Sequence, residues 1–150
     1  MAEKTVSDFT LLDQNGNEFN LYKNLGNNQK VLLVFYPRDS SLVCTKQLKD
    51  YTVKKDLFHK NNLTVVGVNI GNRKSHSDFC NKSGIDFPLL VDEDKTVSRQ
   101  FDALNFLGAN KRKLVLIAPS KAILLDKNIP MITYLNTDEI LNLLIKEKIL

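Results

Sequence analysis

Residues 30–36 read Lys-Val-Leu-Leu-Val-Phe-Tyr, and Pro37 with a short polar segment separates them from Cys44. The run is apolar without alternation, which is typical of a strand that is covered on both faces of a sheet. Pro37 ends the strand because proline has no N–H to donate to a ladder. Beyond it, apolar residues recur at steps of three, four and seven positions, which predicts a helix over 42–60.

The remaining sequence continues this alternation of strands and helices. Asn15-Gly16 predicts a type I′ turn between two short strands, since that turn requires a positive φ at both central positions. Ser75 with Asp78 resembles a capping box at the start of a short helix, and Gly84 stands where a left-handed C-terminal residue belongs. We expect strands over 8–12, 18–21, 63–70, 87–91, 113–118 and 122–126, and helices over 75–83, 95–101 and from 136 or 137 onward.

This order of elements predicts one α/β domain over 1–150, in which helices flank a largely parallel central sheet with an N-terminal antiparallel hairpin at one edge. Hydrophobic residues make up 43% and charged residues 25% of the chain, which suits an ordinary globular core. Two cysteines are too few for a disulfide-stapled mini-domain or a four-thiolate zinc site.

Several classes of function are disfavoured by the sequence. Its apolar runs fall far short of the roughly 20 residues of a membrane span. It also lacks a signal-peptide pattern, so we expect a soluble cytoplasmic protein with no membrane partner. The net charge of +4 comes mostly from scattered lysines, with 111–113 as the one tight basic cluster, which disfavours nucleic acid. Metal-ligand clusters, phosphate-binding loops and dinucleotide fingerprints are absent from the sequence, so we expect neither a metal nor a cofactor.

Cys44 lies at the start of the helix predicted over 42–60. The free N–H groups and the dipole of a helix N-terminus stabilise an anion, so this position favours the thiolate, which is the nucleophilic form of cysteine. A small buried apolar residue on the helix stripe is the alternative interpretation, because free cysteine is often buried and inert. Position alone leaves both interpretations open.

Pro37, Ser41 and Cys44 form the pattern Pro-x-x-x-Ser-x-x-Cys. This pattern resembles the active-site signature of the peroxiredoxins, Pro-x-x-x-Thr/Ser-x-x-Cys, which directly follows a buried strand. Residues 8–11, 15–16 and 87–92 are also similar to that family, and Arg112 falls where the family carries its active-site arginine. Taken together, these segments resemble the bacterioferritin-comigratory, or Q-type, branch of the family. The resemblance implies a thioredoxin-like fold with a mixed central sheet.

The chemistry of these residues suits the reduction of a peroxide. Cys44 supplies the sulfur nucleophile, and the Ser41 hydroxyl can donate to the thiolate or to the peroxide. Arg112 supplies a permanent positive charge, and Pro37 offers an apolar wall. Each residue has a plainer alternative: Ser41 as an ordinary helix cap, Arg112 as a surface arginine. Ser41 stands where threonine is commoner in the family, and 42–43 reads Leu-Val where Pro-Gly is frequent.

The second cysteine, Cys80, is the internal candidate for resolving an oxidised Cys44. Many Q-type members carry a resolving cysteine five residues downstream of the first, where this chain has Lys49. A cysteine on the helix that holds Cys80 resembles the thiol-peroxidase branch instead. The alternative is a buried apolar residue, with resolution by an external thiol. His76 lies one helical turn before Cys80 and could touch it, although a lone surface histidine is the commoner case.

The resemblance implies a thioredoxin-dependent peroxidase that reduces hydrogen peroxide and organic hydroperoxides. Cys80 would form an intramolecular disulfide that thioredoxin or a similar dithiol reduces, and the chain would act as a monomer or weak homodimer. Because a disulfide needs Cα atoms within about 7 Å, we expect local unwinding near either cysteine. The alternatives are a one-cysteine peroxidase and a non-enzymatic redox sensor or binding module. A dithiol oxidoreductase is disfavoured because Cys-x-x-Cys is absent.

Overall fold

A five-stranded mixed sheet forms the centre of the computed structural model, which describes residues 5–150. The strands lie in the order β5-β4-β3-β6-β7. β3 pairs in parallel with β4, and β4 pairs in parallel with β5, whereas β6 runs antiparallel to both β3 and β7. Their bounds are β3 Lys30–Phe35, β4 Leu63–Asn69, β5 Leu89–Val91, β6 Arg112–Ile117 and β7 Ile123–Ile129.

The mixed sheet is as expected, but the expectation of a largely parallel one is wrong. A tight connection joins β6 to β7, in which the Ala118 N–H donates to the Ala122 carbonyl at 2.9 Å. Strands joined by so short a connection run antiparallel, because parallel neighbours need a crossover of a dozen residues or more. The antiparallel edge of the central sheet is therefore formed by the last two strands of the chain, β6 and β7.

The predicted N-terminal hairpin forms a separate two-stranded sheet of β1 (Thr10–Leu12) and β2 (Glu18–Asn20). The expected type I′ turn is wrong, because Gly16 has a φ of +81° while Asn15 is not in the positive region. A longer loop forms instead, in which the Asp13 carboxylate accepts from the N–H groups of Asn15 and Asn17. This side-chain capping favours the wider turn.

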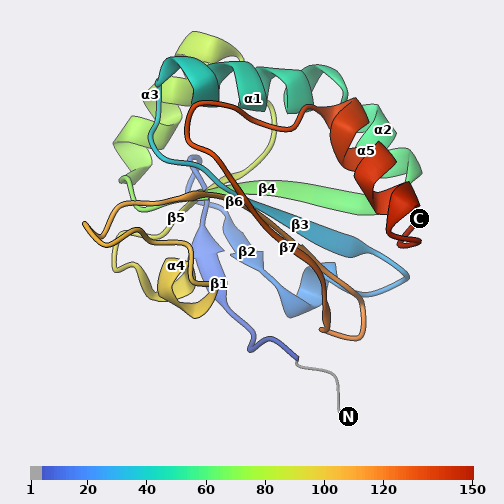
Figure 1. Cartoon of the computed structure of the whole chain (residues 1–150). Coiled ribbons are helices and arrows are strands. Elements are labelled where there is room, and N and C mark those ends of the chain that lie inside the picture. The colour runs from blue at the N-terminus through green and yellow to red at the C-terminus, as the bar shows by residue number, and fades with distance from the viewer. Residues whose placement is uncertain (1–4) are drawn as a thin grey trace.

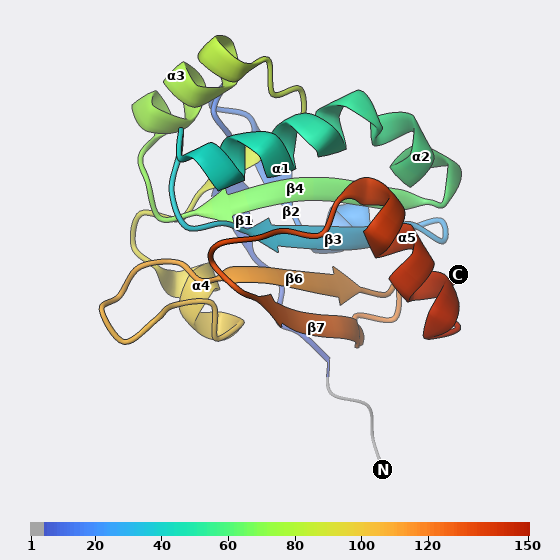
Figure 2. The same ribbon diagram turned by 45° about the horizontal axis from the view of Figure 1, so that its top comes forward.

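Helices cover both faces of the central sheet. Figures 1 and 2 show α1, α2, α3 and α5 over one face, and α4 with the β1–β2 hairpin over the other. None of the helices within residues 5–150 is both long and apolar enough to cross a lipid bilayer. The bounds are α1 Leu42–Val53, α2 Lys55–Lys60, α3 Arg73–Ser83, α4 Thr96–Gln100 and α5 Thr137–Lys146, with a short 3₁₀ helix at Tyr22–Asn24.

Strand β3 contributes to two apolar clusters, one on each face of the sheet. Leu32 and Val34 join the cluster beneath α1, α3 and α5, and Leu33 and Phe35 join the cluster beneath α4 and the hairpin. Successive side chains of a strand point to opposite faces, so a strand covered on both sides must be apolar throughout. This is the physical reason for the unbroken run over 30–36.

The helix predicted over 42–60 is two helices, α1 and α2, separated at Lys54. The Lys54 N–H returns to the Asp50 carbonyl, and its φ of −105° leaves the helical region. Two β-branched residues at 52–53 precede the break, and such residues have low helix propensity. Phe58 still packs edge-on against Tyr51, with ring centroids 5.7 Å apart, so the predicted apolar stripe continues across the break.

Helix α3 begins earlier than predicted because Asn72, rather than Ser75, is its cap. The Asn72 side chain accepts from the Ser75 N–H at 2.8 Å, which places Ser75 inside the first turn. Asp78 pairs with Lys74 at 2.8 Å and takes no part in a capping box. Gly84 ends the helix in the left-handed region at φ 68°, as predicted. The predicted cap of the last helix is confirmed as Asn136.

Candidate functional site

Cys44 is the third residue of α1, directly after the loop that follows β3. Ser41 caps this helix, and its hydroxyl oxygen accepts from the Cys44 N–H at 3.4 Å. The Cys44 side chain is fully buried. The sulfur therefore lies at a helix N-terminus, where the backbone dipoles stabilise a negative charge. The predicted placement of Cys44 at the start of a helix is confirmed, and Ser41 is the cap of that helix.

Arg112 begins β6, beside the strand that leads to Cys44. Only 2% of its surface is exposed, so the surface-arginine alternative is wrong. Its Nη2 donates to the Cys44 sulfur at 3.4 Å and to the Met131 carbonyl at 3.3 Å. Arg112 thus places a permanent positive charge against the Cys44 sulfur.

Gln47 accepts from the Arg112 guanidinium and is itself held by Tyr51, and neither residue was predicted to have this role. Arg112 Nη1 donates to Gln47 Oε1, Gln47 Nε2 donates to the Tyr51 hydroxyl at 3.1 Å, and that hydroxyl donates to the Leu135 carbonyl at 2.6 Å. Burial raises the pKa of Tyr51, which keeps it a neutral donor. The sequence holds one indication of this role for Gln47, because Gln47 is a polar residue beside the apolar stripe of α1.

One donor of Arg112 has no partner. Its Nε is buried and makes no hydrogen bond to any residue within 5–150. A buried donor without a partner costs free energy, so proteins rarely keep one outside a functional site. The site therefore holds a free donor close to the candidate nucleophile.

A surface hollow of about 390 Å³ adjoins these residues. Cys44 does not line it, so the sulfur lies behind the wall, within 3.4 Å of an Arg112 nitrogen. The structure thus brings together all four residues of the sequence-predicted constellation. The lining residues are Pro37, Arg38, Ser41, Leu42, Val43, Ala109, Asn110, Arg112 and Met131.

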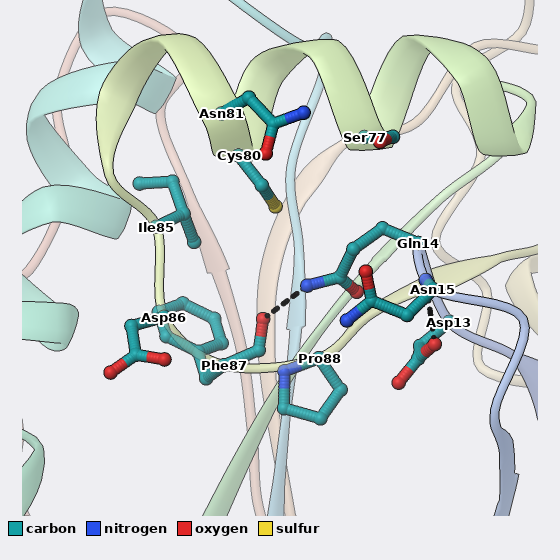
Figure 3. Close-up of a pocket in the computed structure, with 10 residues that line it drawn as sticks. All are labelled: Asp13, Gln14, Asn15, Ser77, Cys80, Asn81, Ile85, Asp86, Phe87 and Pro88. Carbon is teal, nitrogen blue, oxygen red and sulfur yellow. Dashed lines mark hydrogen bonds between the residues drawn. The ribbon is translucent and has the colours of Figure 1, made fainter.

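Cys80 lies apart from this group, on α3. Figure 3 shows its side chain pointing into a second cavity, of about 340 Å³, toward Gln14 and Phe87. Both cysteines are free and buried. Burial, followed by the negative charges of Asp39 and Asp13, raises the pKa of Cys80 to about 11. In this conformation Cys80 is a thiol that does not face the Cys44 hollow.

His76 is fully buried, so its expected place at the surface is wrong. Its ring nitrogens lie 2.7 Å from Asp39 Oδ2 and 3.1 Å from the Leu90 carbonyl, and it makes no hydrogen bond to Cys80. The polar residues around His76 in sequence gave no sign of this burial, because its partners lie 37 and 14 positions away.

Comparison with known proteins relates the chain to curated sequences. The model of the AhpC/TSA family matches residues 2–125. A putative peroxiredoxin bcp of Helicobacter pylori strain J99 is 38% identical over 96 residues, which cover 64% of this chain and 62% of that protein. The chloroplastic peroxiredoxin Q of Sedum lineare is 35% identical over 97 residues, covering 65% and 51%. The matched segments thus span less than two thirds of these relatives' lengths.

Solved structures extend the similarity to nearly the whole chain. Peroxidoxin BcpB of Mycobacterium tuberculosis superposes with a TM-score of 0.83 at 25% identity, over 99% of this chain and 96% of that one. AhpC of Enterococcus faecalis gives 0.86 at 21% identity over 98% and 92%, which shows a shared fold. The thioredoxin-like fold that the sequence resemblance implied is therefore confirmed. With more than half of its length matched by the family model, the chain belongs to the AhpC/TSA family of peroxiredoxins.

Proposed function

We propose that the chain is a thiol-dependent peroxidase that reduces hydrogen peroxide and organic hydroperoxides through Cys44. The observation that carries this proposal is the buried Arg112. Its guanidinium donates to the Cys44 sulfur, its buried Nε has no partner within residues 5–150, and the residue lines a surface hollow. Peroxide reduction needs this combination of an activated sulfur and a donor for the oxygen that accumulates charge.

The first step is attack of the Cys44 thiolate on one peroxide oxygen. The sulfur–oxygen bond forms as the O–O bond breaks, and the second oxygen leaves as hydroxide or alkoxide and takes up a proton from water. Cys44 becomes a sulfenic acid. The positive charge of Arg112 and the Ser41 hydroxyl stabilise the leaving oxygen, and Pro37 closes one wall of the hollow to water.

The second step returns Cys44 to the thiol. The Cys80 sulfur attacks the sulfenic sulfur, water leaves, and a disulfide forms that thioredoxin or a similar dithiol reduces. Cys80 must leave its own cavity to do so, since its raised pKa and its orientation disfavour attack in the closed conformation. The same two observations support the one-cysteine alternative, in which an external thiol reacts with Cys44 directly.

We further infer that 1–150 acts as a single domain, as a monomer or weak homodimer, in a reducing compartment such as the cytoplasm. A reducing compartment suits this function, because the proposed peroxidase needs Cys44 as a free thiol. Analytical ultracentrifugation across a range of concentrations measures the oligomeric state. A tight dimer at micromolar concentration contradicts the monomer or weak homodimer.

Peroxide consumption with thioredoxin, thioredoxin reductase and NADPH tests the activity. Wild type should turn over, and Cys44→Ser should lose at least about a thousandfold in rate, because the nucleophile is gone. A wild-type protein that consumes neither hydrogen peroxide nor cumene hydroperoxide overturns the peroxidase.

Cys80→Ser separates the two resolving routes. If Cys80 resolves, one equivalent of peroxide leaves a Cys44 sulfenic acid in this variant, which dimedone traps and mass spectrometry detects. The wild type should instead form an intramolecular disulfide. Turnover of Cys80→Ser at the wild-type rate with thioredoxin supports the one-cysteine alternative.

A further inference from the structure

A partly buried polar cluster lies between the Cys44 loop and α3, outside the hollow and outside the chemistry proposed above. It consists of Tyr36, Asp39, Ser75 and His76, and we call it the Asp39 cluster. Asp39 Oδ1 accepts from the Tyr36 hydroxyl at 2.6 Å. Asp39 Oδ2 lies 2.6 Å from Ser75 Oγ and 2.7 Å from His76 Nδ1. The side chains of Asp39 and His76 are 6% and 0% exposed.

The hydrogen bonds of the cluster point to a charged carboxylate. His76 lies between Asp39 and the Leu90 carbonyl, with Nδ1 2.7 Å from Asp39 Oδ2 and Nε2 3.1 Å from the carbonyl oxygen. Burial alone would raise the pKa of Asp39, but the hydrogen bonds and charge of His76, with the hydrogen bonds of Ser75 and Tyr36, outweigh burial and lower it. Hydrogen bonds to an ionised carboxylate are about twice as strong as neutral ones.

The cluster joins the two segments that carry the cysteines. Asp39 lies in the loop between β3 and α1, two residues before the Ser41 cap of the Cys44 helix. Ser75 and His76 lie in the first half of α3, and Cys80 follows His76 by one helical turn. Separating α3 from the loop therefore breaks two of the three hydrogen bonds that Asp39 accepts.

The backbone around Asp39 is tightly constrained. Ser40 has a φ of 62°, a strained conformation for a residue with a side chain. A Cβ on Gly71 would lie 2.9 Å from Asn69 Oδ1 and 3.3 Å from both Asp39 Oδ2 and His76 Cε1, so only glycine lets the backbone approach. Tyr36 also packs against His76 and Phe79 of α3, with ring centroids 6.3 Å apart in each pair.

We propose that Asp39 is a positioning residue that holds α3 closed against the Cys44 loop and thereby limits how often Cys80 becomes reactive. The holding role itself does not depend on the proposed function. Its consequence, the rate at which the Cys44–Cys80 disulfide forms, rests on that function. A closed α3 prolongs the life of the Cys44 sulfenic acid. During that time a second peroxide can oxidise it to the sulfinic acid. Asp39 therefore sets the balance between resolution and overoxidation.

The holding role is tested without peroxide. In a Cys44→Ser background, Asp39→Ala should raise the rate of Cys80 alkylation at neutral pH by about tenfold or more, since a hydrogen bond to a charged group shifts an opening equilibrium by about that factor. Hydrogen exchange should accelerate in 36–43 and 73–83 while the central strands keep their protection. Lys74→Ala is the matched control, because it breaks only the exposed Lys74–Asp78 pair of the same helix.

Ser75→Ala is the milder second variant, which remains informative if Asp39→Ala does not fold. It removes one donor from α3 and leaves the contact between Asp39 and His76. Because only a neutral donor is lost, we expect Cys80 alkylation to rise by a few-fold.

With peroxide, rapid mixing separates the two chemical steps. Asp39→Ala should raise the first-order rate of disulfide formation by about tenfold and leave the second-order rate of Cys44 oxidation within about threefold, since Asn69 still holds the backbone carbonyls of Tyr36 and Pro37. A merely structural role would lower both rates. Less sulfinic acid should accumulate in the variant at high peroxide.

Each outcome decides a different point. Unchanged Cys80 alkylation in both variants overturns the holding role of Asp39. An equal loss of protection in the central strands also overturns it, because Asp39 would then support the whole fold. Faster alkylation in both variants and faster exchange in 73–83, with no disulfide even in wild type, support the holding role and overturn Cys80 as the resolving thiol. Faster alkylation in Asp39→Ala alone, without faster exchange, overturns the holding role, because the lost Asp39 charge by itself makes Cys80 more reactive.

Discussion

Cys44 and Cys80 share an apolar cluster beneath the helices of one sheet face, and both side chains are buried. Their electrostatic surroundings differ in sign. Cys44 lies in the first turn of α1, with an Arg112 nitrogen 3.4 Å from its sulfur. Cys80 lies in the second half of α3, where Asp39 and Asp13 add to the effect of burial and raise its pKa to about 11.

The comparison shows that burial alone does not decide the reactivity of a cysteine. Cys44 lies at a helix N-terminus beside a cation, whereas Cys80 lies near two carboxylates that, together with burial, favour its thiol. The contrast also gives the two thiols an order of reaction. In the proposed cycle Cys44 reacts first, and the proposed opening of α3 frees Cys80 from the negative charge around it.

Removing the charge of Arg112 should weaken this contrast most. Arg112→Met keeps an unbranched side chain and deletes both the charge and the donors. We expect kcat/KM for peroxide to fall by about 100- to 1000-fold, the usual cost of removing a donor that stabilises transition-state charge. Stopped-flow oxidation of Cys44 at several peroxide concentrations measures it.

Arg99→Met is the matched control for that variant. It changes the net charge equally, but Arg99 is an exposed residue of α4 whose guanidinium donates to the Asp94 carbonyl at 3.3 Å. Its peroxide kinetics should match wild type. A loss of less than about fivefold in Arg112→Met contradicts the role of the guanidinium in charge stabilisation.

The thiol character of Cys80 is tested by its pH dependence. In a Cys44→Ser background, alkylation of native Cys80 should still rise between pH 9 and 11, because its pKa is raised from an ordinary 9.0 to about 11. In the urea-unfolded chain the alkylation rate should be half-maximal near pH 9 and level off above about pH 10, as for a free thiol. At neutral pH the alkylation rate of the native protein should be about a hundredfold lower than that of the unfolded chain, because two pKa units change the thiolate fraction by about that factor.

The same shift affects stability. A raised pKa in the folded state means that its contribution to stability is complete below pH 9 and is lost as the pH rises toward 11. The loss is about 2–3 kcal/mol for a shift of this size. Urea unfolding at pH 8 and pH 10.5 measures it, with Cys80→Ser as the reference for the other groups that titrate in this range. Equal pH dependence in the two proteins contradicts the raised pKa.

Local sequence patterns predicted the parts of the site that depend on neighbouring residues. The apolar run of β3, the stop at Pro37 and the start of α1 place Cys44 at a helix N-terminus without help from the rest of the chain. The position of Arg112 came from the family resemblance. Its burial depends on Gln47 and Met131, which lie 65 and 19 positions away.

The Asp39 cluster could not be predicted from local pattern. Asp39 stands in Arg-Asp-Ser-Ser and His76 in Lys-Ser-His-Ser-Asp, and both stretches read as exposed loop or helix surface. Only the packing of α3 against the Cys44 loop buries them together, across 37 positions of sequence. Polar residues that are buried through distant partners carry no periodicity, which is the signal that pattern analysis detects.

A smaller effect should follow from losing the support of Arg112. Gln47→Leu leaves Nη1 of the guanidinium buried without its acceptor, so we expect kcat/KM for peroxide to fall by about tenfold. Gln47→Glu retains an acceptor for Arg112 and should keep most of the activity. If Gln47→Leu matches wild type in the same stopped-flow assay, the orientation of Arg112 does not depend on this contact.

The smallest effect is expected from Ser41→Thr. Threonine keeps the hydroxyl that accepts from the Cys44 N–H, and serine and threonine are both good helix caps, so activity should stay within about twofold and stability within a few tenths of a kcal/mol. Ser41→Val has nearly the shape of threonine but no hydroxyl. It should lose about 1 kcal/mol of stability in urea unfolding and, through the missing donor, peroxide activity as well. If the threonine and valine variants have equal activity, the hydroxyl of Ser41 serves only the helix, and the Cys44 site depends on Arg112 alone for its charge stabilisation.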